Sequence, residues 1–152
     1  MSEHIATIKW QRGEQTFTDN RYSRGHEWIF DGGLTVPASP SPSVVPLPYS
    51  VEENVDPEEA FVASLSSCHM LFFLSIAATK GFCVDDYQDD AVGEMGKNEQ
   101  GRTAMLTVRL RPKIQFNGKT PTDKELEKLH HLAHKQCFLA NSVNCQVVTE
   151  IR

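Results

Sequence analysis

The sequence predicts an α+β fold in which antiparallel β-sheets pack around a long central helix and a shorter second one. Three observations predict it. An apolar stretch from Asp56 to Gly81 is too long for a strand, segments with strand-like alternation lie before and after it, and an amphipathic helical pattern follows at 122–137. Strands that come in runs, instead of alternating with helices, favour helices packed on antiparallel sheet. The 152 residues, 39% hydrophobic and 23% charged, fit a single domain.

That single domain, 1–152, is expected to contain three parts: N-terminal strands (1–36), a proline-rich crossing (37–55) and a helix-hairpin-helix-strand core (56–152). Its net charge of −5 disfavours a nucleic-acid partner, which requires a basic face. The chain shows no secretory leader pattern, so we expect a cytoplasmic protein. Its four cysteines match neither a disulfide-rich scaffold nor paired zinc motifs, so they are expected to be thiols.

The N-terminal part is predicted to be a meander of three strands. His4–Trp10 alternates polar and apolar residues, and a turn at Arg12-Gly13-Glu14 leads to a second short strand at Gln15–Thr18. A third strand is expected around Trp28–Val36, interrupted by Gly32-Gly33. In the crossing that follows, five of the eight prolines lie between Pro37 and Pro48. Proline fits neither a helix nor the interior of a sheet, which predicts an extended, semi-rigid segment that wraps over the surface.

The central helix has well-defined ends. Asp56 is an N-cap, Pro57 occupies the first helical position, Glu59 completes a capping box, and Gly81 suits a left-handed C-cap. At about 1.5 Å per residue the helix is roughly 36 Å long. It is apolar or small on every face, and such a helix has to be covered on all sides, which indicates a second copy of the chain. A membrane span was the alternative, but four serines and His69 make the stretch too polar.

The C-terminal part is predicted to hold a hairpin, a helix and a strand. Its hairpin arms are Val84–Met95 and Thr103–Phe116, joined by a polar loop at 97–101. In the second arm Ala104, Leu106, Val108 and Leu110 alternate with polar residues, so one face is buried. A helix then begins with a capping box and carries an apolar stripe, and Asn144–Ile151 closes the chain as a strand. The box and the stripe are formed by Thr122, Glu125, Leu126, Leu129, Ala133 and Cys137.

Two cysteines lie in positions that suggest chemistry. Cys68 sits in the middle of the central helix beside serines and His69, and Cys137 ends the other helix. The segment DPEEAFVASLSSCHM, the hairpin, and then HHLAHKQCFLANS resemble the OsmC/Ohr family of osmotically inducible and organic hydroperoxide resistance proteins. This resemblance implies an OsmC-like intertwined homodimer with two interfacial sites. It also implies a thiol-dependent peroxidase that reduces organic hydroperoxides to alcohols through a sulfenic acid and an intramolecular disulfide.

Residue roles follow from the same resemblance. It implies Cys68 as the peroxidatic cysteine, Cys137 as the resolving one, Glu58 as an acidic site residue and Arg24 as its basic partner, with Arg21 as the alternative arginine. It implies no cofactor and no metal, and an external dithiol or lipoyl-type reductant. The partners expected are a second copy of the chain and an organic hydroperoxide, with neither nucleic acid nor membrane.

The chemistry of the residues agrees with these roles. Peroxide cleavage needs a thiolate, and burial opposes thiolate formation, so a fixed cation is required near Cys68. An arginine stays charged when buried and offers several donors. Glu58 precedes Cys68 by ten residues, roughly 15 Å along one helix, so we expect it to serve the partner's site, with the two central helices antiparallel.

Two other functions are compatible with the sequence. His130, His134 and Cys137 are spaced by one helical turn each and could hold zinc or copper. The chain could also be a non-catalytic dimeric binding protein of the same fold. Cys83 and Cys145 are interpreted as structural.

Overall fold

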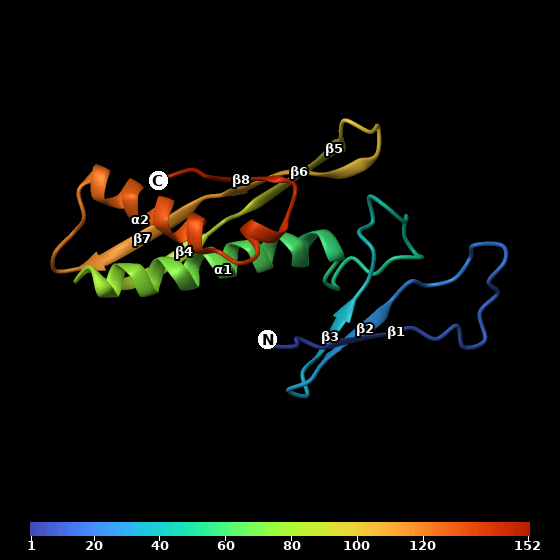
Figure 1. Cartoon of the computed structure of the whole chain (residues 1–152). Helices are drawn as coiled ribbons and strands as arrows, with labels where there is room; N and C mark the ends of the chain where they lie inside the picture. The colour runs from blue at the N-terminus through green and yellow to red at the C-terminus, as the bar shows by residue number, and fades with distance from the viewer. The chain divides into compact units, whose positions relative to one another are not determined.

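A computed structural model describes residues 1–152 and divides them into two units, an N-terminal unit (Met1–Ala60) and a C-terminal unit (Phe61–Arg152). Figure 1 shows the order of the elements along the chain. Two helices, one short 3-10 helix and eight strands form the fold. It is a mixed α+β fold, as the sequence predicted.

The N-terminal unit contains a three-stranded antiparallel meander of β1 (Ala6–Lys9), β2 (His26–Phe30) and β3 (Thr35–Ala38). The region predicted as one strand around Trp28–Val36 is a hairpin, because Gly33 adopts φ 94° and its N–H donates to the Phe30 carbonyl over 2.9 Å.

The strand predicted at Gln15–Thr18 does not form, and this prediction is wrong. The Arg12 side chain donates to the Gln15 carbonyl, and the Gln15 amide donates back to the Arg12 carbonyl, over 2.8 and 2.9 Å. Thr16 is also bonded locally, to the carboxylate of Asp19. These local bonds occupy the groups that a sheet ladder would need.

The proline-rich segment folds back on β3, in contrast to the extended path that the sequence predicted. Ser39 N–H donates to the Val55 carbonyl over 3.0 Å, and Val55 N–H donates to the Pro37 carbonyl over 3.1 Å. The Ser39 hydroxyl accepts a further bond of 2.7 Å from Val51 N–H. Two turns make this return possible, with bonds from Val44 to Ser41 and from Tyr49 to Pro46. Prolines and serines at these positions favour turns.

Helix α1 (Pro57–Thr79) begins and ends where its capping residues predict. Glu59 N–H donates to Asp56 Oδ1 over 2.7 Å, and Asp56 N–H donates back to the Glu59 carboxylate, which confirms the capping box. At the other end Gly81 has φ 85°, and Phe82 N–H donates to the Ala77 carbonyl, a Schellman motif. By length and composition α1 could cross a membrane. One of its faces, formed by Leu65, His69, Phe73 and Ala77, is buried inside the protein.

In the C-terminal unit the predicted hairpin forms, but each arm is two strands. β4 (Cys83–Asp89) pairs with β7 (Pro112–Asn117), and β5 (Val92–Lys97) pairs with β6 (Thr103–Leu110), all antiparallel. The arms break at Asp89 and Arg111, where the Asp89 carboxylate accepts the Arg111 N–H over 2.6 Å. Within the buried face of β6, Val108 and Leu110 are fully buried and Leu106 is partly exposed.

The last strand, β8 (Gln146–Thr149), forms at the predicted place but pairs with β6 in parallel. The C-terminal unit therefore departs from the all-antiparallel expectation at one edge. A parallel pair needs a long crossover connection, and the segment from β7 through the second helix supplies it.

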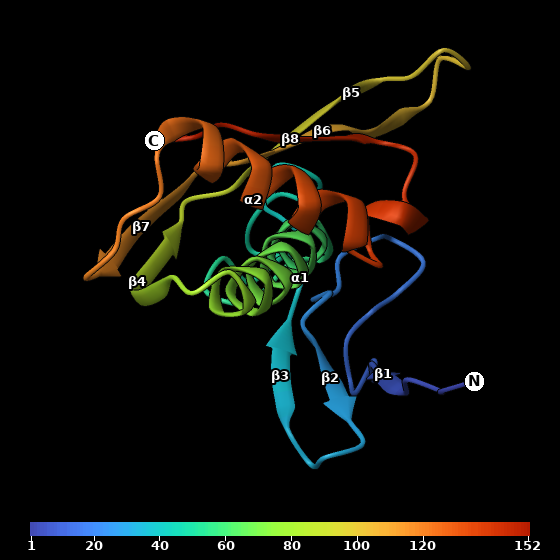
Figure 2. The ribbon, with the colours of Figure 1, turned by 60° about the vertical axis from the view of Figure 1, so that its left-hand side comes forward.

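Helix α2 (Asp123–Gln136) packs on α1 within the C-terminal unit (Figure 2). Its capping box of Thr122 and Glu125 is complete, as predicted. Leu129 and Ala133 join Phe73 and Ala77 in one core, while a second core surrounds Leu65, Val108 and Leu110. A 3-10 turn, η1 (Ala140–Ser142), follows α2 and leads the chain back to β8.

Candidate active site

The structure brings the two predicted cysteines together. Cys68 is half-buried in the middle of α1, and Cys137 is the C-cap residue of α2, with 1% of its surface exposed. Both are free thiols, and Cys68 lies close enough to Cys137 to raise the pKa of the Cys137 thiol. The other two cysteines are elsewhere: Cys83 is exposed at the start of β4, and Cys145 packs against the second core.

The backbone at the end of α2 positions the Cys137 sulfur. Cys137 N–H donates to the carbonyls of Ala133 and His134, and the N–H of Ala140 points at Cys137 Sγ over 3.4 Å. Burial, and to a lesser degree the neighbouring Cys68 thiol, raise the pKa of the Cys137 thiol to about 11, against a smaller opposing effect of the Ala140 N–H. Cys137 is therefore protonated at neutral pH and is unsuited to make the first nucleophilic attack.

Apolar side chains neighbour the two cysteines along the chain. Phe72 on α1 meets Phe138 edge to face, with ring centroids 5.0 Å apart. Phe138 and Leu71 are 71% and 60% exposed, so they offer apolar surface to solvent. Leu65, one turn before Cys68 on α1, is buried in the second core with Val108 and Leu110.

A buried pair of histidines lies next to the thiols. His69 Nε2 and His130 Nδ1 are hydrogen-bonded over 3.0 Å, and the two rings are nearly parallel. Only 1% of His69 and 3% of His130 are exposed. Burial lowers the pKa of each imidazole to about 4, so both rings are neutral at physiological pH.

Sequence reasoning missed this pair. A signal was present for His130, because it follows Leu129 and precedes Ala133 by three residues, which places it on the buried stripe of α2. For His69 only its adjacency to Cys68 distinguished it.

The metal site considered for His130, His134 and Cys137 does not assemble. His130 is committed to His69, and no group of three or more histidine, cysteine or acidic side chains is placed to hold a metal ion.

Arg24 lies in the loop before β2, within the N-terminal unit. Its Nη1 donates to the carbonyls of Asn20 and Tyr22 over 2.8 and 2.5 Å, and its guanidinium carbon lies 3.6 Å from the centroid of the Tyr22 ring. These three contacts fix the Arg24 side chain. The other N–H groups of its guanidinium have no hydrogen-bond partner in the structure. Arg21, the alternative arginine, is exposed and forms no side-chain hydrogen bond.

Glu58 lies in the first turn of α1, within the N-terminal unit. Its neighbour Glu59 closes the capping box, which leaves the carboxylate of Glu58 uncommitted. One oxygen of Glu58 is buried and has no hydrogen-bond partner. A buried carboxylate oxygen without a donor is costly, so this side chain is suited to receive a cationic partner.

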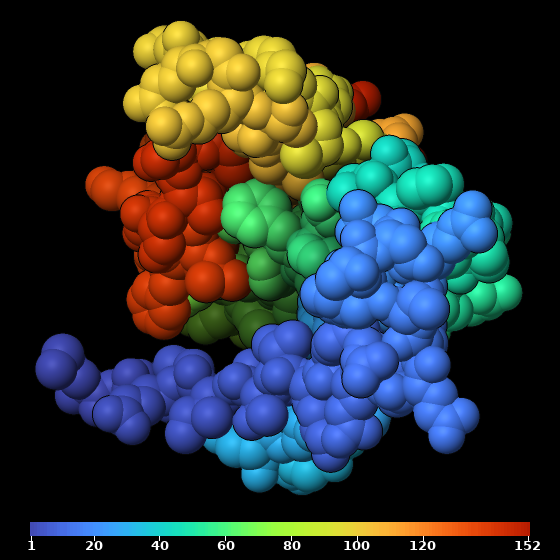
Figure 3. Space-filling model, turned by 90° about the vertical axis from the view of Figure 1, so that its right-hand side faces the viewer, coloured from blue at the N-terminus to red at the C-terminus, as the bar shows by residue number.

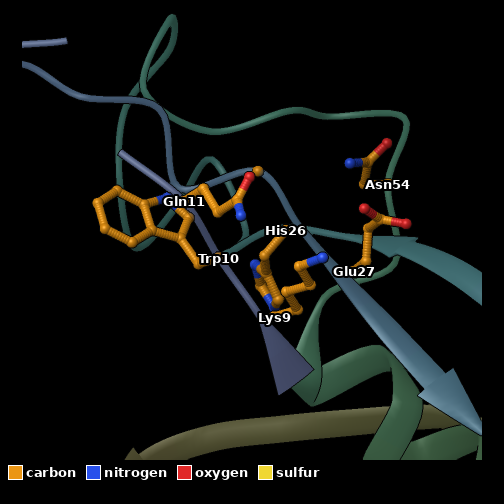
Figure 4. A pocket seen from close by; sticks show the side chains of 7 residues that line it. Lys9, Trp10, Gln11, His26, Glu27 and Asn54 are labelled. Atoms are coloured by element: carbon orange, nitrogen blue, oxygen red, sulfur yellow. The ribbon is translucent and has the colours of Figure 1, made fainter. Parts of the chain in front are cut away.

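The N-terminal unit also has a pocket of about 300 Å³, shown in Figure 4. Its lining contains none of the four predicted site residues. His26 is fully bonded there, since its Nδ1 contacts the Arg24 carbonyl and its Nε2 accepts from the Trp28 indole. Because both of its ring nitrogens are engaged, His26 is not available there as a free base.

Comparison with known proteins gives the same family from sequence and from structure. The family model described as OsmC-like protein matches residues 51–152. An OsmC-like protein of unknown function from Vibrio cholerae is 60% identical, with a TM-score of 0.98 and complete coverage of both chains.

More distant structures share the fold. An organic hydroperoxide resistance protein OsmC from Legionella pneumophila is 15% identical, with a TM-score of 0.70 over 99% of this chain and 96% of its own. The organic hydroperoxide resistance protein OhrB of Bacillus subtilis is 16% identical, with a TM-score of 0.65 over 99% and 98%. None of the curated proteins searched matches the chain. The chain belongs to the OsmC-like protein family.

Proposed function

We propose that the protein is a cysteine-based peroxidase that reduces organic hydroperoxides to alcohols. The observation that carries the proposal is the proximity of a half-buried thiol, Cys68, to a buried thiol, Cys137, whose pKa is raised so that it stays protonated. A half-buried thiol beside a fully buried thiol that stays protonated fits a pair that divides attack and resolution between its members.

The reaction has three balanced steps. The Cys68 thiolate attacks the terminal oxygen of ROOH, the O–O bond breaks, and the alkoxide leaves and takes up a proton to give ROH. Cys68 is then a sulfenic acid, and the Cys137 thiol condenses with it to form a disulfide and release water. An external dithiol, of the lipoyl type or similar, reduces the disulfide by exchange and becomes a disulfide itself.

Arg24 and Glu58 are proposed to complete the site. Arg24 would stabilise the Cys68 thiolate and bind the peroxide, and its rigid contacts with Asn20, Tyr22 and the Tyr22 ring suit it better than Arg21. The unpartnered oxygen of Glu58 supports a role in holding a guanidinium. Because Glu58 and Cys68 are ten residues apart on one helix, roughly 15 Å, we propose that Glu58 serves the site of the partner subunit.

A homodimer is part of the proposal. The single chain leaves much of α1 uncovered, and Figure 3 shows α1 reaching the surface between the β5–β6 hairpin and the C-terminal segment. An apolar helix exposed in this way requires a cover, and antiparallel packing of two copies of α1 in an intertwined dimer would provide it.

The substrate class follows from the side chains around the thiols. Phe72, Phe138 and Leu71 form an apolar approach, which favours an alkyl or aryl hydroperoxide over hydrogen peroxide. Two structures of the same fold are named organic hydroperoxide resistance proteins, which agrees with this choice. We propose that the enzyme acts in the cytoplasm against oxidative stress, without a bound cofactor.

The experiment that tests the function is mass spectrometry of peptides after addition of one equivalent of an aryl hydroperoxide. A Cys68–Cys137 disulfide is expected in the wild type, a Cys68 sulfenic acid in Cys137→Ser, and no oxidation at position 137 in Cys68→Ser. Cys83→Ser is the matched control and should form the same disulfide. If both thiols stay reduced while the alcohol fails to appear, the chain is a binding protein and the peroxidase proposal is wrong.

A further inference from the structure

The hydrogen bond between His69 and His130 is the only one that joins side chains of α1 and α2. His69 follows Cys68 directly on α1. His130 precedes Cys137 by seven residues, two helical turns, so the two lie on the same face of α2. A bond at this point fixes both the rotation of α2 about its axis and its height along α1, and these two quantities determine where Cys137 meets Cys68.

Other contacts at the thiols constrain the approach less. Phe138, which touches Phe72, is 71% exposed and follows the helix end. The histidine pair, by contrast, is buried, and Phe73 packs against the His130 ring with centroids 4.5 Å apart. The pair is therefore a buried polar link between the two helices that carry the thiols.

We infer that the His69–His130 hydrogen bond, which we call the clasp, holds Cys137 against Cys68. We infer further that this bond breaks when the imidazoles take up protons. The inference rests on the proposed function, because the peroxidase cycle is what requires the two sulfurs to meet. Acidification would then slow disulfide formation and leave the Cys68 sulfenic acid exposed to further oxidation.

The chemistry of a histidine pair gives the clasp its dependence on protons. Two neutral imidazoles share one N–H···N bond, and each keeps one further nitrogen. Those nitrogens, His69 Nδ1 and His130 Nε2, are buried without partners. A first proton on the histidine pair places an uncompensated positive charge in a buried site. A second proton leaves both imidazoles fully protonated, so the bonding nitrogen that was the acceptor becomes an N–H donor and two N–H groups face each other.

The charged and titratable groups around the histidine pair do not cancel the cost of protonating it. Burial is the largest cause that keeps His69 neutral, and His134 on α2 acts in the same direction. Asp89 on β4 favours the charged form of His69, but its carboxylate already accepts bonds from Ser66 and from Arg111 N–H. Tyr87, also on β4, packs against Phe73 and stays protonated.

The test measures closure of the thiol pair without peroxide. A dipyridyl disulfide, which still reacts with thiols in acid, first forms a mixed disulfide on Cys68 and releases one thiopyridone. Cys137 then displaces the second thiopyridone and forms the Cys68–Cys137 disulfide. The rate of the second release reports how well Cys137 is seated. The measurements use a Cys83→Ser/Cys145→Ser background, so that only these two thiols react.

The key comparison is with His69→Gln/His130→Asn, in which the two amides can keep a hydrogen bond at the same atoms but do not titrate. We expect the ratio of wild-type to variant closure rates to be near one at about pH 7.5 and to fall at least about fivefold by about pH 3, where both imidazoles are mostly protonated. His130→Leu, which cannot form the bond, should close about tenfold more slowly than wild type already at the higher pH. His131→Asn, an exposed neighbour, should behave as wild type.

A ratio that stays constant across this pH range, or closure of His130→Leu at the wild-type rate, would overturn the clasp. The outcome is separate from that of the proposed function. A pair that closes with the dipyridyl disulfide as expected but forms no disulfide with hydroperoxide would retain the clasp and refute the peroxidase.

Discussion

Phe72 and Phe138 meet edge to face, with ring centroids 5.0 Å apart and planes at 80°, and this contact joins α1 to the residue that follows Cys137. An aromatic pair in this geometry contributes about 0.5–1.5 kcal/mol beyond its buried area. Because Phe138 is 71% exposed, much of its ring remains available to a ligand.

Phe138→Ala is therefore expected to lower kcat/KM for an aryl hydroperoxide by about tenfold, since an apolar contact with the substrate is lost. Turnover of hydrogen peroxide should change little. Peroxidase kinetics with both substrates measure the difference, and Val92→Ala on β5, also an exposed apolar position, is the control. An equal loss with both peroxides would show that Phe138 acts on the thiols instead of the substrate.

Acid should destabilise the fold through the two buried histidines. Their pKa values are about 4 in the folded protein, below the ordinary value of 6.5. Because these pKa values are lowered, the stabilisation is fully present above about pH 6.5 and is lost as the pH falls toward about 4. At 1.36 kcal/mol per pKa unit, each imidazole accounts for roughly 3 kcal/mol.

Urea denaturation between these pH values checks this expectation. His69→Gln/His130→Asn should show a much smaller change in the free energy of unfolding over the same range. If wild type and variant lose stability in parallel, other groups dominate the acid response.

Cys137 should be the slowest thiol to alkylate. It is almost fully buried and its pKa is raised to about 11, so little thiolate forms at neutral pH. Cys83 is exposed and should react first. Time-resolved iodoacetamide labelling of the reduced protein followed by peptide mass spectrometry gives the order. Labelling of Cys137 ahead of Cys83 would contradict the described burial.

The capping box of α2 should contribute measurably to stability. Thr122→Ala removes the bond from Glu125 N–H to the threonine hydroxyl, and we expect a loss of about 1 kcal/mol in the free energy of unfolding. Thr120→Ala is the control, because Thr120 is exposed and lies just outside the helix. Equal effects of the two substitutions in urea denaturation would mean that the cap is not important.

Gly93 has no room for a side chain. A Cβ there would lie 2.6 Å from Val62 Cγ2 and 2.7 Å from Met105 Sδ, so Gly93→Ala should destabilise the protein by about 1–3 kcal/mol. Gly32→Ala meets open space and should cost little. Thermal unfolding of the two variants compares them, and equal melting temperatures would show that α1 and β5 can separate at no cost.

The N-terminal strands show where prediction from sequence fails. Alternation at Gln15–Thr18 predicted a strand, but the side chains of Arg12 and Gln15 bond to each other's backbone carbonyls, and Thr16 bonds to the nearby Asp19 side chain. Alternation alone does not reveal such competition. The prediction for the proline-rich segment failed for a related reason. Its serines and prolines form turns that return the chain to β3, whereas the sequence had predicted an extended crossing.

Local signals in the sequence were enough to predict both capping boxes, the Gly81 end of α1, the stripe of α2 and the loop of the long hairpin. In each case a few consecutive residues supply the hydrogen bonds that start or stop the element. The folded chain was needed to establish the parallel pairing of β8, the break in the hairpin arms at Asp89, the proximity of Cys68 to Cys137 and the burial of His69 against His130. These depend on groups far apart in the chain, whose meeting is set by how the helices and sheets pack, and no local pattern encodes that packing.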